Sequence, residues 1–452
     1  MKPRPPLPGG PYLVVGLARS GVAAALALRA RGDEVIGVDA GAPVHPGLKA
    51  AAGRLRKAGV EVHLDASGDA LAARARTLIK SPGVPQHAPA VAAARLRGLA
   101  VVGELELAWR LMPNQFIAVT GTNGKTTTSE WIGHIHREAG EPVAVSGNVG
   151  TAVSSLVGSV SADATVVCEA SSFQLEDTEA FSPEAAVLLN LAADHLDRHG
   201  SYGSYVAAKL RIFANQGNDD VAVAPAGLGI EDLGGCARRV CFGSRPNDDV
   251  QVRAGMLWWG REALLGVDEL SLPGEHNRDN AMAAAAVCLA RGLPRDAVAA
   301  GLRTFPGVAH RLEPLAVKRG VAYVNDSKAT NVASTLVALR AYPGAVHLIA
   351  GGRGKQEDFS PLAPLVAERC RAVYLLGEAS AELAAALASA GVPVRTVADL
   401  ERATEASSRA ARPGDTGLLS PACASYDQYT DFEARGEHFR ALVASIENGS
   451  EG

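Results

Sequence analysis

A glycine-rich segment, Gly121-Thr122-Asn123-Gly124-Lys125-Thr126-Thr127, stands between an apolar run, 116–120, and a helical pattern that begins at residue 128. In such a turn the glycines let backbone N–H groups surround phosphate oxygens, and the following helix N-terminus adds partial positive charge. Lys125 can reach the β- and γ-phosphates of ATP, and Thr126 can offer its hydroxyl to Mg²⁺. Val119 takes the place of the first glycine of the full Walker pattern, and a helix N-cap turn without a ligand is the alternative.

Apolar runs bounded by Gly or Pro alternate with helical stretches along most of the chain, which is typical of parallel sheets covered by helices. We therefore predict an α/β fold of three domains, residues 1–103, 104–308 and 309–452. The predicted strands are 12–15, 34–38, 77–80 and 100–102, then 116–120, 142–146, 165–168 and 185–190, and finally 321–325, 346–350, 372–376, 394–397 and 417–420. A helix rich in alanine is predicted over 280–291.

Composition excludes several classes of protein. Lys+Arg 44 against Asp+Glu 48 gives a net charge of -4, so the chain has no basic excess for nucleic acid. No run approaches about 18 apolar residues, and the proline-rich start lacks the apolar core of a secretory signal. The six cysteines show no metal-ligand spacing. We expect a cytoplasmic protein that is not embedded in a membrane.

The first predicted strand is followed by Gly16-Leu17-Ala18-Arg19-Ser20-Gly21 and a helix, and Asp39 stands at the end of the second strand. This spacing is similar to the dinucleotide-binding turn and its ribose-binding acid, although Ala18 replaces the middle glycine. The pattern favours a nucleotide diphosphate as ligand. A βαβ turn with no ligand is the alternative.

Other polar positions follow predicted strands or stand at domain junctions, where clefts form. They are Glu169, the run 194–199, Lys209, His310 with Arg311, the run 325–331, and Lys355. Each has an ordinary structural explanation: a solvated strand end for Glu169, a surface loop for His195 and His199, and an exposed helix position for Lys209. The residues alone predict an ATP-using enzyme with several polar loops around one cleft.

These motifs, in this order over about residues 10–445, resemble the Mur ligases of peptidoglycan synthesis. The segment 121–127 is similar to the family's ATP loop, and three central-domain signatures are similar to 146–150, 169–176 and 194–198. Residues 208–212 resemble the segment whose lysine is carbamylated in the family. Gly274-Glu275-His276-Asn277 with Asn280 resembles the segment that approaches the adenine.

The C-terminal motifs resemble the branch of the family that adds D-glutamate. The similarity covers His310-Arg311, the run 325–331, and 419–428. The Asp-Asn-Pro-Arg motif of the diaminopimelate- and lysine-adding ligases does not occur in the chain. Folylpolyglutamate synthetase, a relative with the same ATP loop, begins near that loop, whereas roughly a hundred residues precede it here.

The resemblance implies Rossmann-like first and third domains, which bind the UDP-substrate and glutamate, and a central P-loop-type ATPase sheet. It implies an ATP-dependent ligase that joins D-glutamate to UDP-N-acetylmuramoyl-L-alanine through an acyl phosphate, with two Mg²⁺ ions. The implied catalytic residues are Lys125, Glu169, His195 and Lys209, and the metal ligands are Thr126, Glu169, His195 and carbamylated Lys209. The implied ATP contacts are Gly121, Thr122, Asn123, Gly124, Lys125, Thr126, Thr127, Asn277 and Asp326.

The implied contacts to the UDP-substrate are Ser20, Asp39, Gly83, Asn148 and His195. The implied glutamate contacts are His310, Lys328, Thr330, Lys355, Ser425 and Phe432. Asp39 is followed by Ala40-Gly41, where the family branch commonly has Thr-Arg beside the uridine. We expect a monomer.

Three alternatives remain open at this point. The first is the same ligation with L-glutamate, or a related ATP-dependent amide ligation. The second is a nucleotide-sugar dehydrogenase that uses the Gly16 turn for NAD, against which stand the missing glycine and an otherwise unused ATP loop. The third is an ATP-binding switch whose outer domains dock partners.

Overall fold

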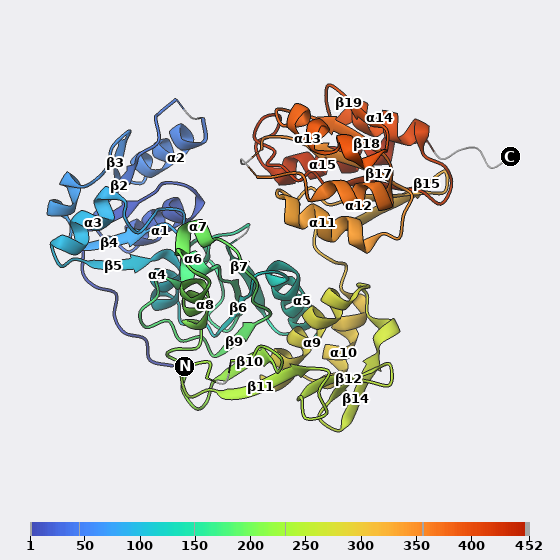
Figure 1. Cartoon of the computed structure of the whole chain (residues 1–452). Helices are drawn as coiled ribbons and strands as arrows, with labels where there is room; N and C mark the ends of the chain where they lie inside the picture. The colour runs from blue at the N-terminus through green and yellow to red at the C-terminus, as the bar shows by residue number, and fades with distance from the viewer. Residues whose placement is uncertain (1, 45, 149, 231, 355–356, 448–452) are drawn as a thin grey trace. The chain divides into compact units, whose positions relative to one another are not determined.

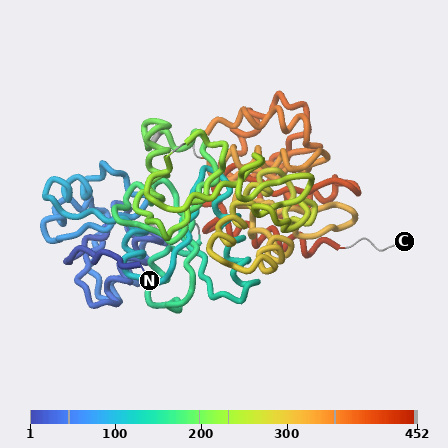
Figure 2. The backbone as a smooth tube through the Cα atoms, turned by 90° about the horizontal axis from the view of Figure 1, so that it is seen from below, coloured from blue at the N-terminus to red at the C-terminus, as the bar shows by residue number. Residues whose placement is uncertain are grey.

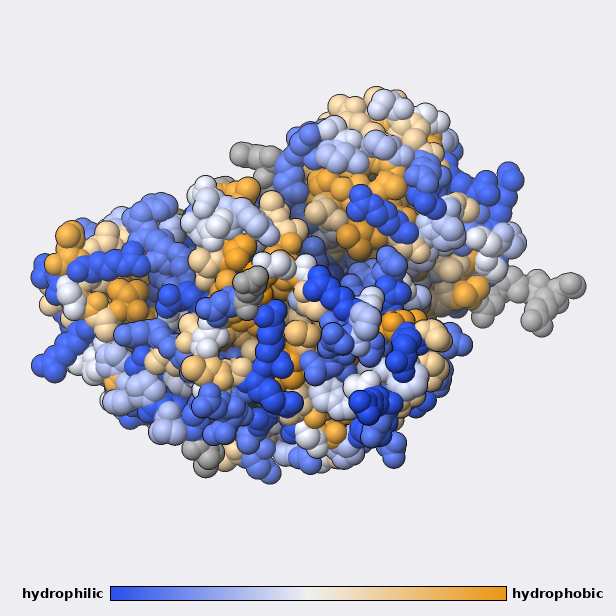
Figure 3. Space-filling view, turned by 60° about the horizontal axis from the view of Figure 1, so that its bottom comes forward, coloured by the Kyte–Doolittle hydropathy of each residue, from blue (hydrophilic) through white to orange (hydrophobic). Residues whose placement is uncertain are grey.

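The computed structural model describes residues 2–44, 46–148, 150–230, 232–354 and 357–447. The chain divides into two compact units, residues 1–306 and 307–452. Three sheets lie within these units, two in the first and one in the second (Figure 1). In the described ranges no helix has the length and apolar character needed to cross a bilayer. The face in Figure 3 shows apolar side chains in separate groups among hydrophilic ones.

The first sheet has five parallel strands in the order β3-β2-β1-β4-β5. They are β1 (Tyr12–Val15), β2 (Val35–Asp39), β3 (Glu61–Leu64), β4 (Thr77–Lys80) and β5 (Ala100–Gly103), joined through α1 (Arg19–Ala30), α2 (Pro46–Lys57), η1 (Ala70–Arg74) and α3 (Pro89–Leu96). The first turn of α1 packs so closely on the end of β1 that it requires glycine at residue 21, because a Cβ there would lie 1.8 Å from the Gly16 carbonyl oxygen.

The second sheet has nine strands in the order β14-β13-β12-β11-β10-β9-β6-β8-β7. They are β6 (Phe116–Thr120), β7 (Val143–Gly147), β8 (Thr165–Glu169), β9 (Ala185–Leu188), β10 (Val221–Pro225), β11 (Arg238–Gly243), β12 (Val250–Arg253), β13 (Met256–Trp259) and β14 (Glu262–Gly266). Its helical elements are α4 (Glu104–Leu111), α5 (Lys125–Glu138), η2 (Val153–Leu156), α6 (Ser172–Leu175), α7 (Leu196–His199), α8 (Tyr202–Leu210), η3 (Val267–Glu269), α9 (Glu275–Ala290) and α10 (Arg295–Thr304).

The third sheet has six strands in the order β15-β16-β20-β17-β18-β19. They are β15 (Glu313–Lys318), β16 (Val321–Asn325), β17 (Val346–Gly351), β18 (Cys370–Leu376), β19 (Val394–Thr396) and β20 (Thr416–Leu419). The helical elements around them are α11 (Val332–Ala341), α12 (Leu362–Arg369), α13 (Ser380–Ala386), η4 (Ala388–Ala390), α14 (Leu400–Ala410) and α15 (Phe432–Ser445). Apolar side chains of the central strands and the covering helices form its core.

The α/β fold predicted from the sequence is confirmed, and every predicted strand is present within two residues of its expected bounds. Several features differ. The parallel strands β3, β10 and β11 were not predicted. The strands β12–β14 pair antiparallel, as do β15 and β16, where only parallel strands were expected. The helix expected over 280–291 begins five residues earlier, at Glu275. Its first turn is polar and lacks the alanine pattern that predicted the rest.

The N-terminal segment before β1 lies against residues beside the second sheet, the central sheet of the chain. Figure 2 shows the start of the chain at this place. The Lys2 ammonium pairs with Asp220 and donates to Ser182 Oγ at 2.6 Å. The Arg4 guanidinium donates to the carbonyl oxygens of Trp109 and Asn114. These contacts fasten the segment to the second sheet before the chain enters the first.

A fully buried ion pair connects β4 to the segment after α6. Lys80 Nζ lies 2.7 Å from Asp177 Oδ2, with 0% and 3% of the two side chains exposed. Burial lowers the pKa of Lys80, and the Asp177 charge opposes that change. The pair stabilises the fold only while both charges are present, because either one alone would be buried without a counter-charge.

We predict that Lys80→Met lowers the free energy of unfolding by about 3–5 kcal/mol, because it leaves the Asp177 carboxylate buried and unpaired. Lys80→Met combined with Asp177→Asn removes both charges and recovers a large part of that loss. Urea denaturation of the wild type, both single variants and the double variant measures the coupling. Strictly additive losses would contradict the ion-pair account.

Candidate functional site

The phosphate loop lies at the carboxyl end of β6, between that strand and α5. Lys125, the first residue of α5, donates from Nζ to the carbonyl oxygens of Gly121 and Thr122, each at 3.0 Å. Gly124 has φ 84°, and a Cβ there would lie 2.2 Å from Asn280 Oδ1. The loop therefore curls around the lysine ammonium group and needs glycine at residue 124.

Thr126 and Glu169 meet beside this loop. Thr126 Oγ1 donates to Glu169 Oε2 at 2.6 Å, and Asn148 Nδ2 donates to Glu169 Oε1 at 3.2 Å. Glu169 ends β8, the neighbour of β6, and is only 4% exposed, so it is not the solvated strand end that its position alone suggests. A Cβ at Gly147 would lie 2.2 Å from the Glu169 carbonyl oxygen, so glycine allows this close approach.

The hydroxyl of Thr126 and the carboxylate of Glu169 are hard oxygen donors, the kind that Mg²⁺ prefers. They converge at the N-terminus of α5, where the phosphates of a nucleotide would supply further oxygen ligands. Across the described residues, no group of three His, Cys, Asp or Glu side chains could hold a metal by itself. This donor set fits a Mg²⁺ ion that a nucleotide brings with it.

Lys209 is buried beside the same loop. It belongs to α8 and is 2% exposed, which corrects the expectation of an ordinary exposed helix lysine. Its Nζ donates to the Gly121 carbonyl oxygen at 2.8 Å and lies 4.8 Å from the centre of the Tyr205 ring. Burial, together with the charge of Lys125, lowers the pKa of Lys209 to about 7. Near neutral pH a large share of the amine is therefore uncharged and nucleophilic.

This pKa makes stability depend on pH. The folded-state pKa of Lys209 is about 7, below the ordinary 10.5 of an unfolded chain. Between these values the unfolded state binds more protons, so the stability that Lys209 contributes rises with pH through this window and is lowest below it. In bicarbonate-free buffer we predict that the stability of wild type relative to Lys209→Met increases from pH 7 to 10. A difference that stays constant with pH would contradict the depressed pKa.

His195 precedes α7 with φ 51°, and its side chain is half exposed. Its Nε2 lies 3.5 Å from Asp194 Oδ2, and its ring centre lies 4.8 Å from that of Phe173. No hydrogen bond joins His195 to Lys209 in the part of the chain that the structure describes. Of the two residues expected to share a metal ion, Lys209 is buried and His195 is half exposed.

Asn277 lies in the first turn of α9 and donates from Nδ2 to the Pro273 carbonyl oxygen at 2.8 Å. Its Oδ1 accepts from Asn280 Nδ2 at 3.4 Å. The Asn280 side chain in turn contacts Thr128 Oγ1, at 3.3 Å, in the helix that follows the phosphate loop. A chain of amide side chains thus connects Asn277 with that loop.

Ser20, Asp39 and Gly83 lie at the carboxyl ends of the neighbouring strands β1, β2 and β4 in the first sheet. Asp39 accepts from the backbone N–H groups of Leu17 at 2.6 Å and Gly41 at 2.7 Å. Its carboxylate therefore holds the turn after β1 in place. Doubly wound sheets bind ligands at the carboxyl ends of their strands, so the three residues lie where a nucleotide could bind.

In the second unit, His310, Lys328 and Phe432 lie close together. Asn325 Nδ2 donates to His310 Nδ1 at 2.9 Å, and the Lys328 backbone N–H donates to the His310 carbonyl oxygen at 2.9 Å. Lys328 Nζ lies 5.9 Å from the centre of the Phe432 ring. The backbone N–H of Thr330 donates to the Lys328 carbonyl oxygen at 2.9 Å, so the four predicted residues share one loop cluster.

Two other predicted residues of this unit are buried. Ser425 is almost fully buried, and its carbonyl oxygen accepts from the N–H groups of Gln428 and Tyr429. Asp326 accepts from Ser420 Oγ at 2.7 Å, and burial raises the pKa of Asp326 to about 7. Lys355 lies outside the described residues.

Sequence reasoning missed Arg435, which organises this loop cluster. The guanidinium, 2% exposed, donates to the carbonyl oxygens of Cys423 at 3.2 Å and Ser327 at 2.8 Å. It thereby ties together the loops after β20 and β16, which are adjacent strands. In the sequence it is a single arginine within a helical pattern, so no local signal distinguishes it from a surface residue.

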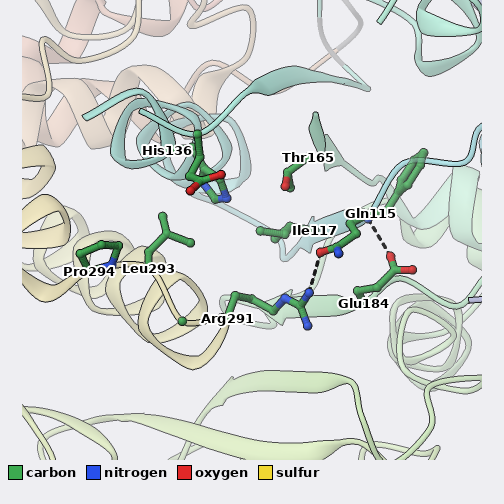
Figure 4. Close-up of a pocket in the computed structure, with 11 residues that line it drawn as sticks. Gln115, Ile117, His136, Thr165, Glu184, Arg291, Leu293 and Pro294 are labelled. Carbon is green, nitrogen blue, oxygen red and sulfur yellow. Dashed lines mark hydrogen bonds between the residues drawn. The ribbon is translucent and has the colours of Figure 1, made fainter. Parts of the chain in front are cut away.

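A separate pocket of about 210 Å³ lies where β6, β8 and β9 begin, at the end of the central sheet away from the phosphate loop (Figure 4). Arg291 Nη2 donates to Gln115 Oε1 at 2.6 Å, and Glu184 accepts from the Phe116 N–H at 2.7 Å. None of the residues predicted from the sequence to act in the site lines this pocket.

Comparison with known proteins finds relatives that match nearly the whole chain. The Mur ligase middle domain matches residues 119–288, and the Mur ligase glutamate ligase domain matches residues 310–423. The UDP-N-acetylmuramoylalanine–D-glutamate ligase of Pelotomaculum thermopropionicum is 42% identical over 447 residues, covering 97% of this chain and 98% of that protein. The ligase of the same name from Acidobacterium capsulatum is 41% identical over 450 residues, covering 97% and 96%.

Among solved structures, UDP-N-acetylmuramate-alanine ligase MurC from Thermotoga maritima has the same fold, with a TM-score of 0.62 at 20% identity. The match covers 96% of this chain and 99% of that one. The resemblance noted in the sequence is thus confirmed by full-length relatives and by the fold. The chain belongs to the Mur ligase family, in the branch of the UDP-N-acetylmuramoylalanine–D-glutamate ligases.

Proposed function

We propose that this protein is an ATP-dependent ligase that adds D-glutamate to UDP-N-acetylmuramoyl-L-alanine, in the cytoplasm and as a monomer. The observation that carries the proposal is the cluster around the phosphate loop, where Lys125, Thr126, Glu169 and Lys209 converge. The names of the full-length relatives supply the substrate class. The dehydrogenase leaves this cluster unexplained, and the ATP-binding switch gives no role to the buried Lys209 amine beside the loop.

The proposed reaction has two steps. A carboxylate oxygen of the alanyl group attacks the γ-phosphorus of ATP, the bond to the β-phosphate oxygen breaks, and ADP leaves. The amine nitrogen of glutamate then attacks the acyl carbon, loses a proton, and displaces phosphate, which retains the carboxylate oxygen. Such a transfer mainly requires positioning and neutralisation of charge. The Lys125 ammonium and the N–H groups at the start of α5 are suited to both tasks.

Mg²⁺ would be held by Thr126 and Glu169, and a second ion by His195 and carbamylated Lys209. When bound, Mg²⁺ neutralises phosphate charge. The ATP loop comprises Gly121, Thr122, Asn123, Gly124 and Thr127 besides Lys125 and Thr126, with Asn277 and Asp326 as further ATP contacts. Carbamylation would convert the Lys209 amine into an anionic oxygen ligand. A pKa of about 7 favours it, because the neutral amine nitrogen attacks the carbon of CO₂ and releases a proton to solvent.

For the other substrates, Ser20, Asp39, Gly83, Asn148 and His195 would contact the UDP-substrate. The glutamate contacts would be His310, Lys328, Thr330, Lys355, Ser425 and Phe432. The cationic members of this set offer partners for the glutamate carboxylates. Arg435 would support them by holding the two loops that carry Lys328 and Ser425.

An isotope-transfer experiment tests the acyl-phosphate route. UDP-N-acetylmuramoyl-L-alanine labelled with ¹⁸O in its carboxylate is incubated with the protein, ATP, Mg²⁺ and D-glutamate. We expect one ¹⁸O atom in each phosphate released, because the displaced phosphate keeps the attacking oxygen. Unlabelled phosphate formed together with ligated product would overturn the proposed route.

Ser425 provides a test of the glutamate side. We predict that Ser425→Ala raises the KM for D-glutamate by about tenfold, the loss expected when one hydrogen bond to a charged ligand disappears. The KM for ATP should change by less than about twofold. Steady-state kinetics with each substrate varied in turn gives both values. Equal changes in the two would argue against contact between Ser425 and glutamate.

A further inference from the structure

The loop of residues 81–84, between β4 and α3, rests on the turn that follows β1. Ser81 donates from its backbone N–H to the Val15 carbonyl oxygen at 3.1 Å and from Oγ to the Gly16 carbonyl oxygen at 2.7 Å. The loop contains Gly83, a proposed contact of the UDP-substrate. Its conformation therefore helps to shape the nucleotide end of that site.

One guanidinium holds three consecutive carbonyl groups of this loop. Arg198 Nη2 donates to the carbonyl oxygens of Pro82 at 3.0 Å and Val84 at 3.1 Å, and Nη1 donates to that of Gly83 at 3.4 Å. The planar fork of arginine can satisfy several acceptors at fixed angles, which lysine cannot do. Arg198 thus fixes the peptide planes of the loop.

Arg198 itself is fixed by a contact with α6. Its Cζ lies 4.3 Å from the centre of the Phe173 ring, a cation–π contact. Phe173 stands in α6, four residues after Glu169, and Arg198 stands in α7, three residues after His195. The loop of the first sheet is therefore held by the two segments that carry proposed metal ligands.

The two ends of the loop are held by a single carboxylate. Lys80, just before the loop, pairs with Asp177 Oδ2 at 2.7 Å, and Gln86, just after it, donates to Asp177 Oδ1 at 2.7 Å. The Asp177 carbonyl oxygen accepts from the Gly103 N–H at 3.2 Å. Asp177 follows α6, so it belongs to the same segment as Phe173.

We infer that Arg198, supported by the Lys80–Asp177 pair, is a positioning residue that sets the nucleotide end of the UDP-substrate in register with the phosphate loop. The inference rests on the proposed function. Without the guanidinium, three carbonyl groups lose their donor, and binding of the UDP-substrate must order the loop at an entropic cost. None of the proposed contacts of ATP or glutamate lies in this loop, so we expect their binding to be spared.

Arg198→Gln, Arg198→Lys and the control Arg303→Gln test this inference. Arg303 is an exposed arginine of the same unit that pairs with Glu269, so its variant removes one charge far from the loop in sequence. The dissociation constant of UDP-N-acetylmuramoyl-L-alanine is measured by calorimetry without ATP, alongside KM for each substrate, kcat and the thermal unfolding midpoint.

For Arg198→Gln we expect KM and Kd for the UDP-substrate to rise by about tenfold or more, with KM for ATP and D-glutamate within about twofold of wild type. Arg198→Lys should show the same split at a smaller size, and it serves if the Gln variant does not fold. Arg303→Gln should match wild type. An unchanged Kd for the UDP-substrate, or an equal rise in all three KM values, would overturn the inference.

The two proposals fail in different ways. If wild type neither binds UDP-N-acetylmuramoyl-L-alanine nor turns it over, the proposed function fails. If wild type does both and the Arg198 variants bind the UDP-substrate as tightly, only the positioning role fails.

Discussion

Replacing Lys125 with alanine is expected to reduce ligation by about a thousandfold or more. The ammonium group stands at the N-terminus of α5 within 3.0 Å of two loop carbonyl oxygens, where it is positioned to meet the β- and γ-phosphates. Preorganised cations of this kind stabilise the charge that develops on a transferring phosphoryl group. Loss of one typically lowers kcat by a factor of about 10²–10³ or more. Phosphate release under saturating substrates measures the effect.

The control for this prediction is Lys57→Ala, which removes one exposed lysine of the same unit. It should leave kcat within about twofold of wild type. Calorimetry with the UDP-substrate should show that Lys125→Ala still folds and binds it. Turnover of Lys125→Ala near the wild-type rate would refute the assignment of 121–127 as the ATP loop.

Lys209→Ala is expected to reduce the rate of ligation by a similar factor, for a different reason. The buried amine, with its pKa near 7, is suited to carbamylation, and alanine removes both the amine and the oxygen ligands that the carbamate would provide. Alanine vacates the space that the Lys209 side chain fills beside the Gly121 carbonyl oxygen, and a small carboxylate there would offer oxygen ligands in place of the carbamate. Added acetate should therefore restore part of the activity.

Two further measurements separate this role from a structural one. Wild type prepared without bicarbonate should lose activity and regain it when bicarbonate is added. Lys209→Met, whose longer side chain fills the space, should fold but respond less to acetate than Lys209→Ala. Full activity of Lys209→Ala without any added carboxylate would rule out a metal-bridging carbamate.

The sequence predicted the parts of the fold that depend on local patterns. Most buried parallel strands are short apolar runs, and the turn at Gly121–Thr127 has its own signature, so these were found at nearly correct bounds. The parallel strands β3, β10 and β11 were missed. The hairpins of β12–β14 were missed, because strands of four or five residues with mixed polarity carry little periodic signal. The polar first turn of α9 was missed for the same reason.

The placement of the candidate site residues could be predicted from the sequence where they belong to one loop. It could not be predicted where it depends on burial against distant segments. Lys209 has the sequence context of an exposed helix lysine, and only the packing of α8 against the Gly121 loop buries it. Lys80 and Asp177 are 97 residues apart, so their pairing depends entirely on the tertiary fold. Arg198 and Arg435 likewise act through carbonyl groups of distant loops. Side-chain type alone carries no information about such partners.

The most direct test of the account is phosphate release by the purified protein with ATP, Mg²⁺ and UDP-N-acetylmuramoyl-L-alanine, comparing D-glutamate, L-glutamate and no amino acid. The account predicts release that depends on D-glutamate, with stoichiometric formation of the ligated product. Release that depends on L-glutamate would keep the fold and mechanism but contradict the proposed product. Absence of release with either amino acid would contradict the proposed function.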